Sequence, residues 1–179
     1  MRIKRVGRVT AEEIADIDAS FDVIYEAMPP FDGPRLQRIE PVSPYRKIYT
    51  PDPEDQEQDG DKLLAVAEGG GGRTCGYLRV SRGWNGFAVV EDIVVDRDSR
   101  RSELGRLLMD EARRWARDEG LAGIRLETQS NNVPACMFYQ AYGFMLGGSD
   151  RHLYAALGES RRETALFWYY FLPGVLPAA

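Results

Sequence analysis

Hydrophobic positions between residues 62 and 129 follow two different periods, one typical of strands and one typical of a helix. The runs 62–68, "KLLAVAE", and 75–81, "CGYLRVS", flank the glycine turn 69–72 and predict a hairpin. The run 87–96, "FAVVEDIVVD", is rich in β-branched residues and is typical of a central strand buried on both faces. From Leu104 to Trp115 apolar residues recur at helical spacing, which predicts a helix that ends near Glu119, before Gly120.

The next stretch returns to a strand pattern and then to a helix. "GIRLETQ" at 123–129 predicts a strand, and Asn132 is placed to cap a helix that ends near Tyr142, before Gly143. Strand, helix and strand over 87–129 form a βαβ unit, so we expect its two strands to be parallel and joined by a right-handed crossover. The late segments "FMLGG", "RHLY" and "ALFWYYFL" are further strand candidates.

The first sixty residues carry weaker patterns. Residues 3–9 alternate loosely and predict a short strand, and Thr10 with Glu13 forms a capping box that predicts a helix to about Ser20. The segment 28–61 is rich in proline, so we expect an extended or irregular course there. Its end, 52–61, holds six acidic residues and no basic one, and setting these six aside changes the net charge from −5 to +1. The acidity is therefore mostly that of one solvated loop.

Composition excludes several classes of protein. A chain of 179 residues fits one domain, which we place at 1–179. It has no apolar run of membrane-spanning length and no signal-peptide core near its start, so we expect a cytoplasmic protein without membrane contact. Cys75, Cys136 and one histidine predict neither a disulfide framework nor a metal site. The arginines are interleaved with acids, so we expect no nucleic-acid partner.

Three arginines gather where the helix after 87–96 begins. Arg100, Arg101 and Arg106 lie at a helix N-terminus, where the macrodipole disfavours cations. The first amides of a helix lack partners within it, so with these arginines they would form an anion site suited to a pyrophosphate. The alternative is a set of solvated surface arginines.

The segment 126–144 favours the anion site over solvated surface arginines. It has the spacing Asn-x6-Tyr-x3-Gly-Phe, carried by Asn132, Tyr139 and Gly143, with Ala135 between them. Together with "VEDIVV" and the arginine-led turn, it resembles the GNAT superfamily of acetyl-CoA-dependent N-acetyltransferases. "WNGFAVVEDIVV", "LETQSNNVPACMFY" and "GFMLGGSDRHLY" are similar, more narrowly, to the streptothricin acetyltransferases, over roughly 84–171.

This resemblance implies an α/β (α+β) fold with a mixed, mostly antiparallel sheet of about seven strands, flanked by helices, in which two parallel central strands splay apart. Acetyl-CoA would enter between those strands, and its pantetheine would bind Asn132 and the backbone of Ile93, Val94 and Val95. The pyrophosphate would lie on the turn formed by Arg100, Arg101, Ser102, Leu104, Gly105 and Arg106. Glu103 replaces the first glycine of the family pattern, which leaves two interpretations, a phosphate site that is weakened but intact, or a cofactor that is lost or altered.

The resemblance also implies the catalytic roles. Tyr139 matches the general acid that protonates the leaving thiolate, with a core tyrosine as the alternative. Glu91 and Asp92 should point to opposite faces of one strand, and we favour Glu91 as the base that takes the proton of the amine, with Glu127 in reserve. The alternative is that these carboxylates are structural partners of an arginine. Cys136 could carry an acyl group but fits a small core residue better.

The resemblance further implies that the substrate is a primary amine of a cationic antibiotic, the β-lysine moiety of streptothricin, and that the activity confers antibiotic resistance. Acidic and aromatic side chains could bind such a ligand, namely Asp92, Trp84, Glu127 and Asp150. Two alternatives are an N-acetyltransferase for another primary amine, such as a polyamine, an amino sugar or a protein N-terminus, and a CoA-binding module without catalysis. A homodimer is compatible with the sequence, which leaves the oligomeric state open.

Overall fold

The computed structural model describes residues 2–48, 56–57, 60–158 and 162–174. Seven strands form one mixed, mostly antiparallel sheet with a single parallel pair, which confirms the predicted fold class. Their order in the sheet is β1 (Arg2–Arg5), β6 (Lys62–Glu68), β7 (Thr74–Arg82), β8 (Phe87–Val95), β9 (Gly123–Gln129), β11 (Ala165–Phe171) and β10 (Met145–Asp150). The chain divides into two compact units, 1–21 with 48–124 and 172–179, and 22–47 with 125–171.

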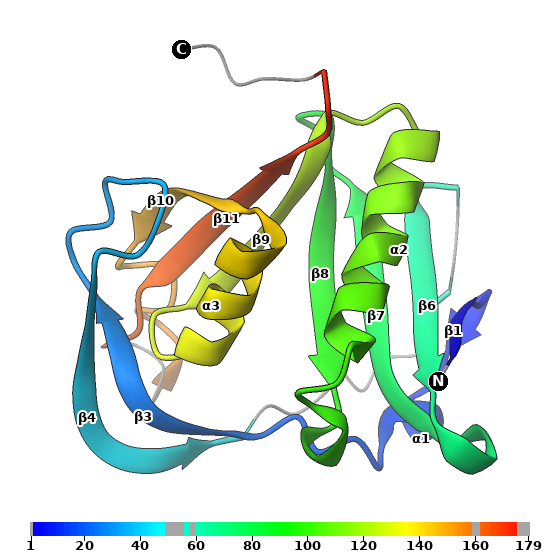
Figure 1. Ribbon diagram of the computed structural model, residues 1–179, viewed down its shortest axis with the longest axis horizontal. Coiled ribbons are helices and arrows are strands. Elements are labelled where there is room, and N and C mark those ends of the chain that lie inside the picture. The colour runs from blue at the N-terminus through cyan, green and yellow to red at the C-terminus, as the bar shows by residue number, and fades with distance from the viewer. Residues whose placement is uncertain (1, 49–55, 58–59, 159–161, 175–179) are drawn as a thin grey trace. The chain divides into compact units, whose positions relative to one another are not determined.

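The first unit contains β6, β7 and β8 with helix α2 (Leu104–Asp118), which lies along these strands (Figure 1). Every residue of β6 from Leu63 to Ala67 is buried, so both faces of that strand are covered. α2 buries one stripe of its surface, as its helical spacing predicts. Helix α1 (Ala11–Ile14) belongs to a separate apolar cluster of Val9, Ile14, Ile17, Leu64, Val66 and Tyr77.

The second unit contains helix α3 (Val133–Tyr142) and a two-stranded ribbon of β3 (Phe21–Met28) and β4 (Arg38–Lys47). α3 begins at Asn132, whose side-chain oxygen accepts a hydrogen bond from the amide of Ala135 at 3.3 Å. It ends at Gly143, whose φ of 113° is favourable for glycine and strained for other residues. Figure 1 shows α3 (yellow) beside β9 and β11 of the same unit.

Two predicted elements are wrong. The first helix stops at Ile14, well before Ser20, because the following backbone bonds to distant residues: the amide of Asp18 donates to Asp96 Oδ2 at 3.1 Å. "RHLY" at 151–154 is a turn rather than a strand. There Asp150 Oδ1 accepts the amide of His152 at 2.7 Å, a local bond that competes with strand pairing.

The proline-rich segment 28–61 is more regular than its composition indicates. It contains β4, a strand of 10 residues that passes through Pro41 and Pro44 and, among the strands that the structure describes, pairs with β3 alone. Farther along, β2 (Arg8–Val9) pairs with β5 (Gln56–Glu57), while most of the acidic stretch 52–61 lies outside the described residues. Across the parts of the chain that the structure covers, no helix has the length and apolar character needed to cross a membrane.

Candidate active site

Strand β8 carries a β-bulge at its two acidic residues. Arg79 of β7 pairs with Asp92 and Val80 pairs with Val90, so Glu91 is the extra residue of the bulge. The guanidinium of Arg79 contacts both carboxylates, at 3.1 Å from Nη1 to Asp92 Oδ2 and 3.9 Å from Nη2 to Glu91 Oε2. The prediction that Glu91 and Asp92 point to opposite faces is therefore wrong, because the bulge interrupts the alternation of side chains.

The turn after β8 is organised by a buried carboxylate. Asp96 is 3% exposed, and its Oδ1 accepts the amide of Asp98 at 3.1 Å at the start of the short 3-10 helix η2 (Arg97–Ser99). Its Oδ2 accepts the amide of Asp18 at 3.1 Å and Nη2 of Arg73 at 3.2 Å. The turn is thus fixed from both sides before α2 begins.

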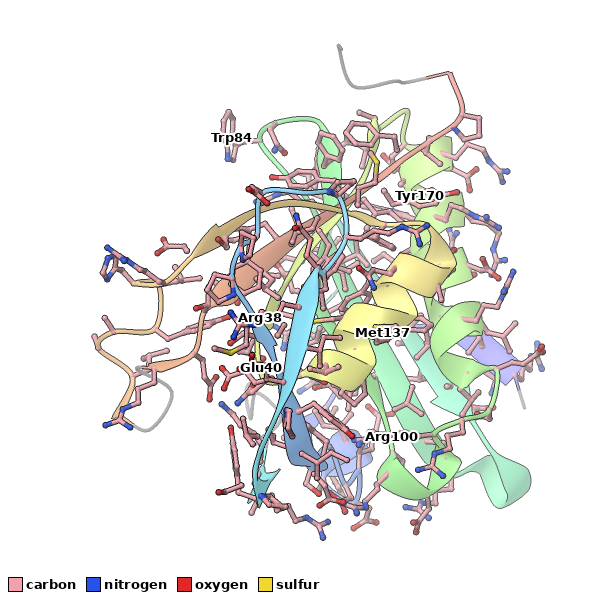
Figure 2. The ribbon with its side chains drawn as sticks, turned by 60° about the vertical axis from the view of Figure 1, so that its left-hand side comes forward. Arg38, Glu40, Trp84, Arg100, Met137 and Tyr170 are labelled. Carbon is pink, nitrogen blue, oxygen red and sulfur yellow. The ribbon has the colours of Figure 1, made fainter. Side chains whose placement is uncertain are left out.

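Arg100 is part of the same framework. Its guanidinium donates to three backbone carbonyls, those of Val95 at 3.0 Å, Ser20 at 2.6 Å and Asp18 at 3.3 Å. Figure 2 shows this side chain near the N-terminal end of α2. These contacts make Arg100 a positioning residue for the turn. This role does not depend on the contact with phosphate that the resemblance implies.

The start of α2 has the features of an anion site. Arg101 has a left-handed φ of 60°, and its side chain and that of Arg106 are exposed. Glu103 occupies the N-cap position with φ −75° and ψ 0° and makes no side-chain cap, so it does not compete for the first amides of the helix. Ser102 Oγ donates to the carbonyl of Ser99 at 2.6 Å, which closes the turn. Leu104 is fully buried and anchors the start of the helix. Backbone amides and two exposed arginines give this turn the groups that fit a pyrophosphate.

The residues expected at the pantetheine follow the bulge. Ile93, Val94 and Val95 pair with β7 and are half-buried, and Val94 packs against the apolar cluster around α1. In the second unit, Asn132 uses its side-chain oxygen as the N-cap of α3. Its contact with pantetheine stays a prediction.

Tyr139 lies on the buried face of α3. It is 6% exposed, and its ring centroid lies 5.5 Å from Phe138, 5.7 Å from Phe144 and 6.2 Å from Trp168. One turn earlier, Cys136 is fully buried, and this burial raises the pKa of its thiol to about 12. A thiol that stays protonated is a poor nucleophile, so Cys136 fits a core residue and not an acyl carrier.

The remaining acidic candidates differ in their surroundings. Tyr154 is buried, and its hydroxyl donates to Glu127 Oε1 on β9. Although Glu127 as a whole is exposed, burial around its carboxylate raises its pKa. Asp150 helps to line a cavity of about 490 Å³ in the second unit, together with Pro29, Phe31, Ser149, Arg151, His152 and Thr164.

Trp84 stands at the tip of the β7–β8 hairpin in the first unit. It is 93% exposed, and Figure 2 shows its side chain clear of the hairpin. The residues that sequence reasoning missed are Arg79, Asp96 and Tyr154. Arg79 could have been found from the sequence, because it is a charged residue inside the otherwise apolar "YLRV" of a strand, whereas no sequence pattern points to Tyr154. Among the described residues no group of His, Cys, Asp and Glu is arranged to hold a metal ion.

The chain is similar to known proteins both in sequence and in structure. Residues 25–144 match the acetyltransferase (GNAT) family. Streptothricin acetyltransferase of Escherichia coli is 40% identical over 130 residues, which cover 73% of this chain and 72% of the relative. A Bacillus anthracis protein assigned as a streptothricin acetyltransferase, crystallised with acetyl coenzyme A, is 29% identical with a TM-score of 0.81, over 96% of this chain and 99% of that one.

The crystal structure of nourseothricin acetyltransferase is 34% identical, with a TM-score of 0.81 over 96% of this chain and 98% of that one. The two structural matches each cover 96% of this chain, and they agree with the family model and with the sheet described above. The chain therefore belongs to the acetyltransferase (GNAT) family, in which its relatives are streptothricin acetyltransferases.

Proposed function

We propose that this acetyltransferase moves the acetyl group of acetyl-CoA to a primary amine of streptothricin, on its β-lysine moiety, and so inactivates the antibiotic. The observation that carries this proposal is the 40% identity to the Escherichia coli streptothricin acetyltransferase over 72% of that enzyme. The crystal structure of the Bacillus anthracis relative with acetyl coenzyme A supports the same acetyl donor for this chain.

The turn before α2 is the site that we assign to the pyrophosphate of the donor. Backbone amides of Ser102 and Gly105 would donate to its oxygens, and the amide of Leu104 would exchange its 3.4 Å bond to Ser102 Oγ for one to a phosphate oxygen. The exposed side chains of Arg101 and Arg106 would balance its charge. Arg100 would keep this turn in place through its three carbonyl contacts. The backbone of β8 after the bulge, at 93–95, would bind the pantetheine as an added strand does.

The chemistry needs three things from the protein: removal of a proton from the substrate ammonium, polarisation of the thioester carbonyl, and protonation of the departing thiolate. We assign the last step to Tyr139, whose ring is held by Phe138, Phe144 and Trp168. A rigid ring keeps its hydroxyl in one orientation, which favours a positioned acid.

Recognition of a cationic antibiotic would use acidic and aromatic side chains. The cavity beside Asp150 and Phe31 offers a carboxylate and an aromatic ring, the two groups that attract a guanidinium-like ring. Asp92 has Arg79 as its ion-pair partner, and Arg151 lines the same cavity as Asp150, so each carboxylate would act beside a guanidinium. Glu127 and Trp84 complete the set that we propose for substrate binding.

The decisive experiment is incubation with acetyl-CoA and streptothricin, followed by mass spectrometry of the product. A mass gain of one acetyl group on the β-lysine moiety supports the proposal, and Asp92→Asn should then raise KM for the antibiotic. Polyamines and aminoglycosides serve as controls, since preferential turnover of either would assign the enzyme to another amine. Binding of acetyl-CoA without turnover of any amine would instead identify a module without catalysis.

A further inference from the structure

Glu127 occupies an unusual place in β9. Its neighbours Leu126 and Thr128 are 4% and 5% exposed, whereas Glu127 is exposed. Because side chains alternate along a strand, Glu127 points to the face opposite to these two core residues. A carboxylate is thus carried on an inner strand of the sheet, on a side chain that is in part exposed.

The partner of this carboxylate is a phenol and not a cation. Tyr154 is the only buried residue between 151 and 158, and its hydroxyl donates to Glu127 Oε1. The acidic residues of β8 and of the turn after it have basic partners: Glu91 and Asp92 share Arg79, and Asp96 contacts Arg73. Within the described residues no lysine or arginine forms an ion pair with Glu127.

We propose that Glu127 is the general base of the acetyl transfer and that Tyr154 is a positioning residue that fixes its carboxylate. This inference rests on the proposed function and deepens it, since it transfers to Glu127 the role that the sequence analysis gave to Glu91. Tyr154 occupies Oε1, so Oε2 is the oxygen that accepts the proton of the substrate.

The proton balance of the step is complete. The substrate enters as an ammonium ion, and one proton moves from its nitrogen to Oε2 of Glu127, which leaves a neutral amine. The nitrogen then bonds to the acetyl carbon, the carbon–sulfur bond breaks, and the thiolate takes the proton of the Tyr139 hydroxyl. The second proton lost by the nitrogen restores Tyr139, and Glu127 releases its proton to solvent, so one proton is released for each acetyl group transferred.

The surroundings suit this role. Burial without a compensating cation raises the pKa of Glu127, and a base works best when its pKa approaches the working pH. Tyr154 adds a hydrogen bond that orients the carboxylate without supplying the full positive charge that would hold it as an anion. Arg125 lies two residues before Glu127 and points to the same face of β9. Its Nε is buried and has no hydrogen-bond partner in the described part of the chain.

The test compares Glu127→Gln with Glu40→Gln, a matched change in the same unit at a residue paired with Arg38 (Figure 2). With streptothricin, or with whichever amine of the panel the wild type accepts, we expect kcat of Glu127→Gln to fall about 100- to 10,000-fold. Acetyl-CoA affinity and melting temperature should stay close to wild type, and Glu40→Gln should keep full activity. Tyr154→Phe should lower kcat by a smaller factor, since the base remains but loses its orientation.

Chemical rescue separates a base from a merely structural carboxylate. Glu127→Ala leaves space for a small carboxylate, so added formate should restore turnover in a concentration-dependent way, and it should not rescue Tyr139→Phe. The proposal is overturned if Glu127→Gln changes only KM, if formate has no effect on Glu127→Ala, or if Glu91→Gln shows the larger loss of kcat. If the wild type does not acetylate streptothricin but acetylates another amine, and Glu127→Gln lowers kcat for that amine, only the proposed substrate is refuted. If the wild type turns over no amine, both the proposed function and the role of Glu127 are refuted.

Discussion

Replacing Arg100 with methionine distinguishes an arginine that holds the turn from one that binds phosphate. The guanidinium donates to the carbonyls of Val95, Ser20 and Asp18 at 3.0, 2.6 and 3.3 Å. Hydrogen bonds from a charged donor contribute roughly 1.5–3 kcal/mol each. One of the three is long, and the freed carbonyls can be hydrated in part, so we expect a total loss of about 3 kcal/mol. For a chain of this size that lowers the melting temperature by about 6–12 °C.

Arg101→Met is the matched comparison. This neighbour is exposed, so its replacement should change the melting temperature by no more than about 2 °C. If Arg101 pairs with the pyrophosphate, acetyl-CoA should bind about 5- to 20-fold more weakly, and the difference from wild type should shrink as salt is added. Arg113→Met, on the exposed side of α2, controls for the loss of one positive charge and should leave affinity unchanged.

The assay is calorimetric titration of acetyl-CoA together with thermal unfolding of the unliganded protein. Arg100→Met should show a large loss of stability. Its affinity for acetyl-CoA should fall less than that of Arg101→Met, because Arg100 acts on the site through the position of the turn. The reasoning is refuted if Arg100→Met unfolds at the wild-type temperature and loses acetyl-CoA affinity as Arg101→Met does. In that case the carbonyl contacts contribute nothing and Arg100 is a phosphate ligand.

Four further predictions follow from individual side chains. Tyr139→Phe should lower kcat about 10- to 1,000-fold in single-turnover kinetics, with acetyl-CoA binding and melting temperature preserved, because the ring packing remains. Glu103→Gly should bind acetyl-CoA up to ~30-fold more tightly by calorimetry, since a like charge about 7 Å from the phosphates costs roughly 2 kcal/mol at an effective dielectric of ~20. Glycine is acceptable at an N-cap, so the melting temperature should not fall, and weaker binding would count against this placement of the pyrophosphate. For Glu111, burial alone would raise the pKa, but hydrogen bonds from Arg114 and Arg5 outweigh it and place the pKa below the ordinary 4.5. Glu111→Gln should therefore cost about 2 kcal/mol in urea unfolding at pH 7, with a difference that disappears as the pH falls from 4.5 through the lower native value. Cys136 should resist alkylation by iodoacetamide at pH 8 in the native protein, and mass spectrometry should find no acetylated cysteine after turnover.

Local sequence patterns were sufficient to predict the helices and strands around the candidate site. Asn132 and Gly143 mark the two ends of α3, because a side-chain cap and a left-handed stop are both decided within a few residues. The β-branched run of β8 and the helical spacing of α2 are likewise readable from the chain alone. These elements appear within one or two residues of their predicted bounds.

Features that depend on distant partners could not be predicted. The bulge at Glu91 is a property of the register with β7, and no pattern within β8 reveals it. The contacts of Arg100 with residues 18–20 join segments about eighty positions apart. The bond from the amide of Asp18 to Asp96, which ends the first helix early, spans a similar separation. The pair of Tyr154 and Glu127 is hidden for the same reason, since the tyrosine lies in a turn that the sequence presents as a strand.

Strand β4 has a consequence for the behaviour of the protein in a crowded cell. With 10 residues it is the longest strand in the described part of the chain, most of its side chains are exposed, and it pairs only with β3. A long open edge of this kind invites another molecule to add a strand, which is the first step of aggregation. Amides of successive residues point to opposite sides of a strand, and Pro41 and Pro44 are three positions apart, so one of the two removes a donor from the open edge. An approaching strand finds a gap there where a hydrogen bond should form. The prolines that appear to argue against regular structure thus help to protect the strand that contains them from pairing with another copy of the chain.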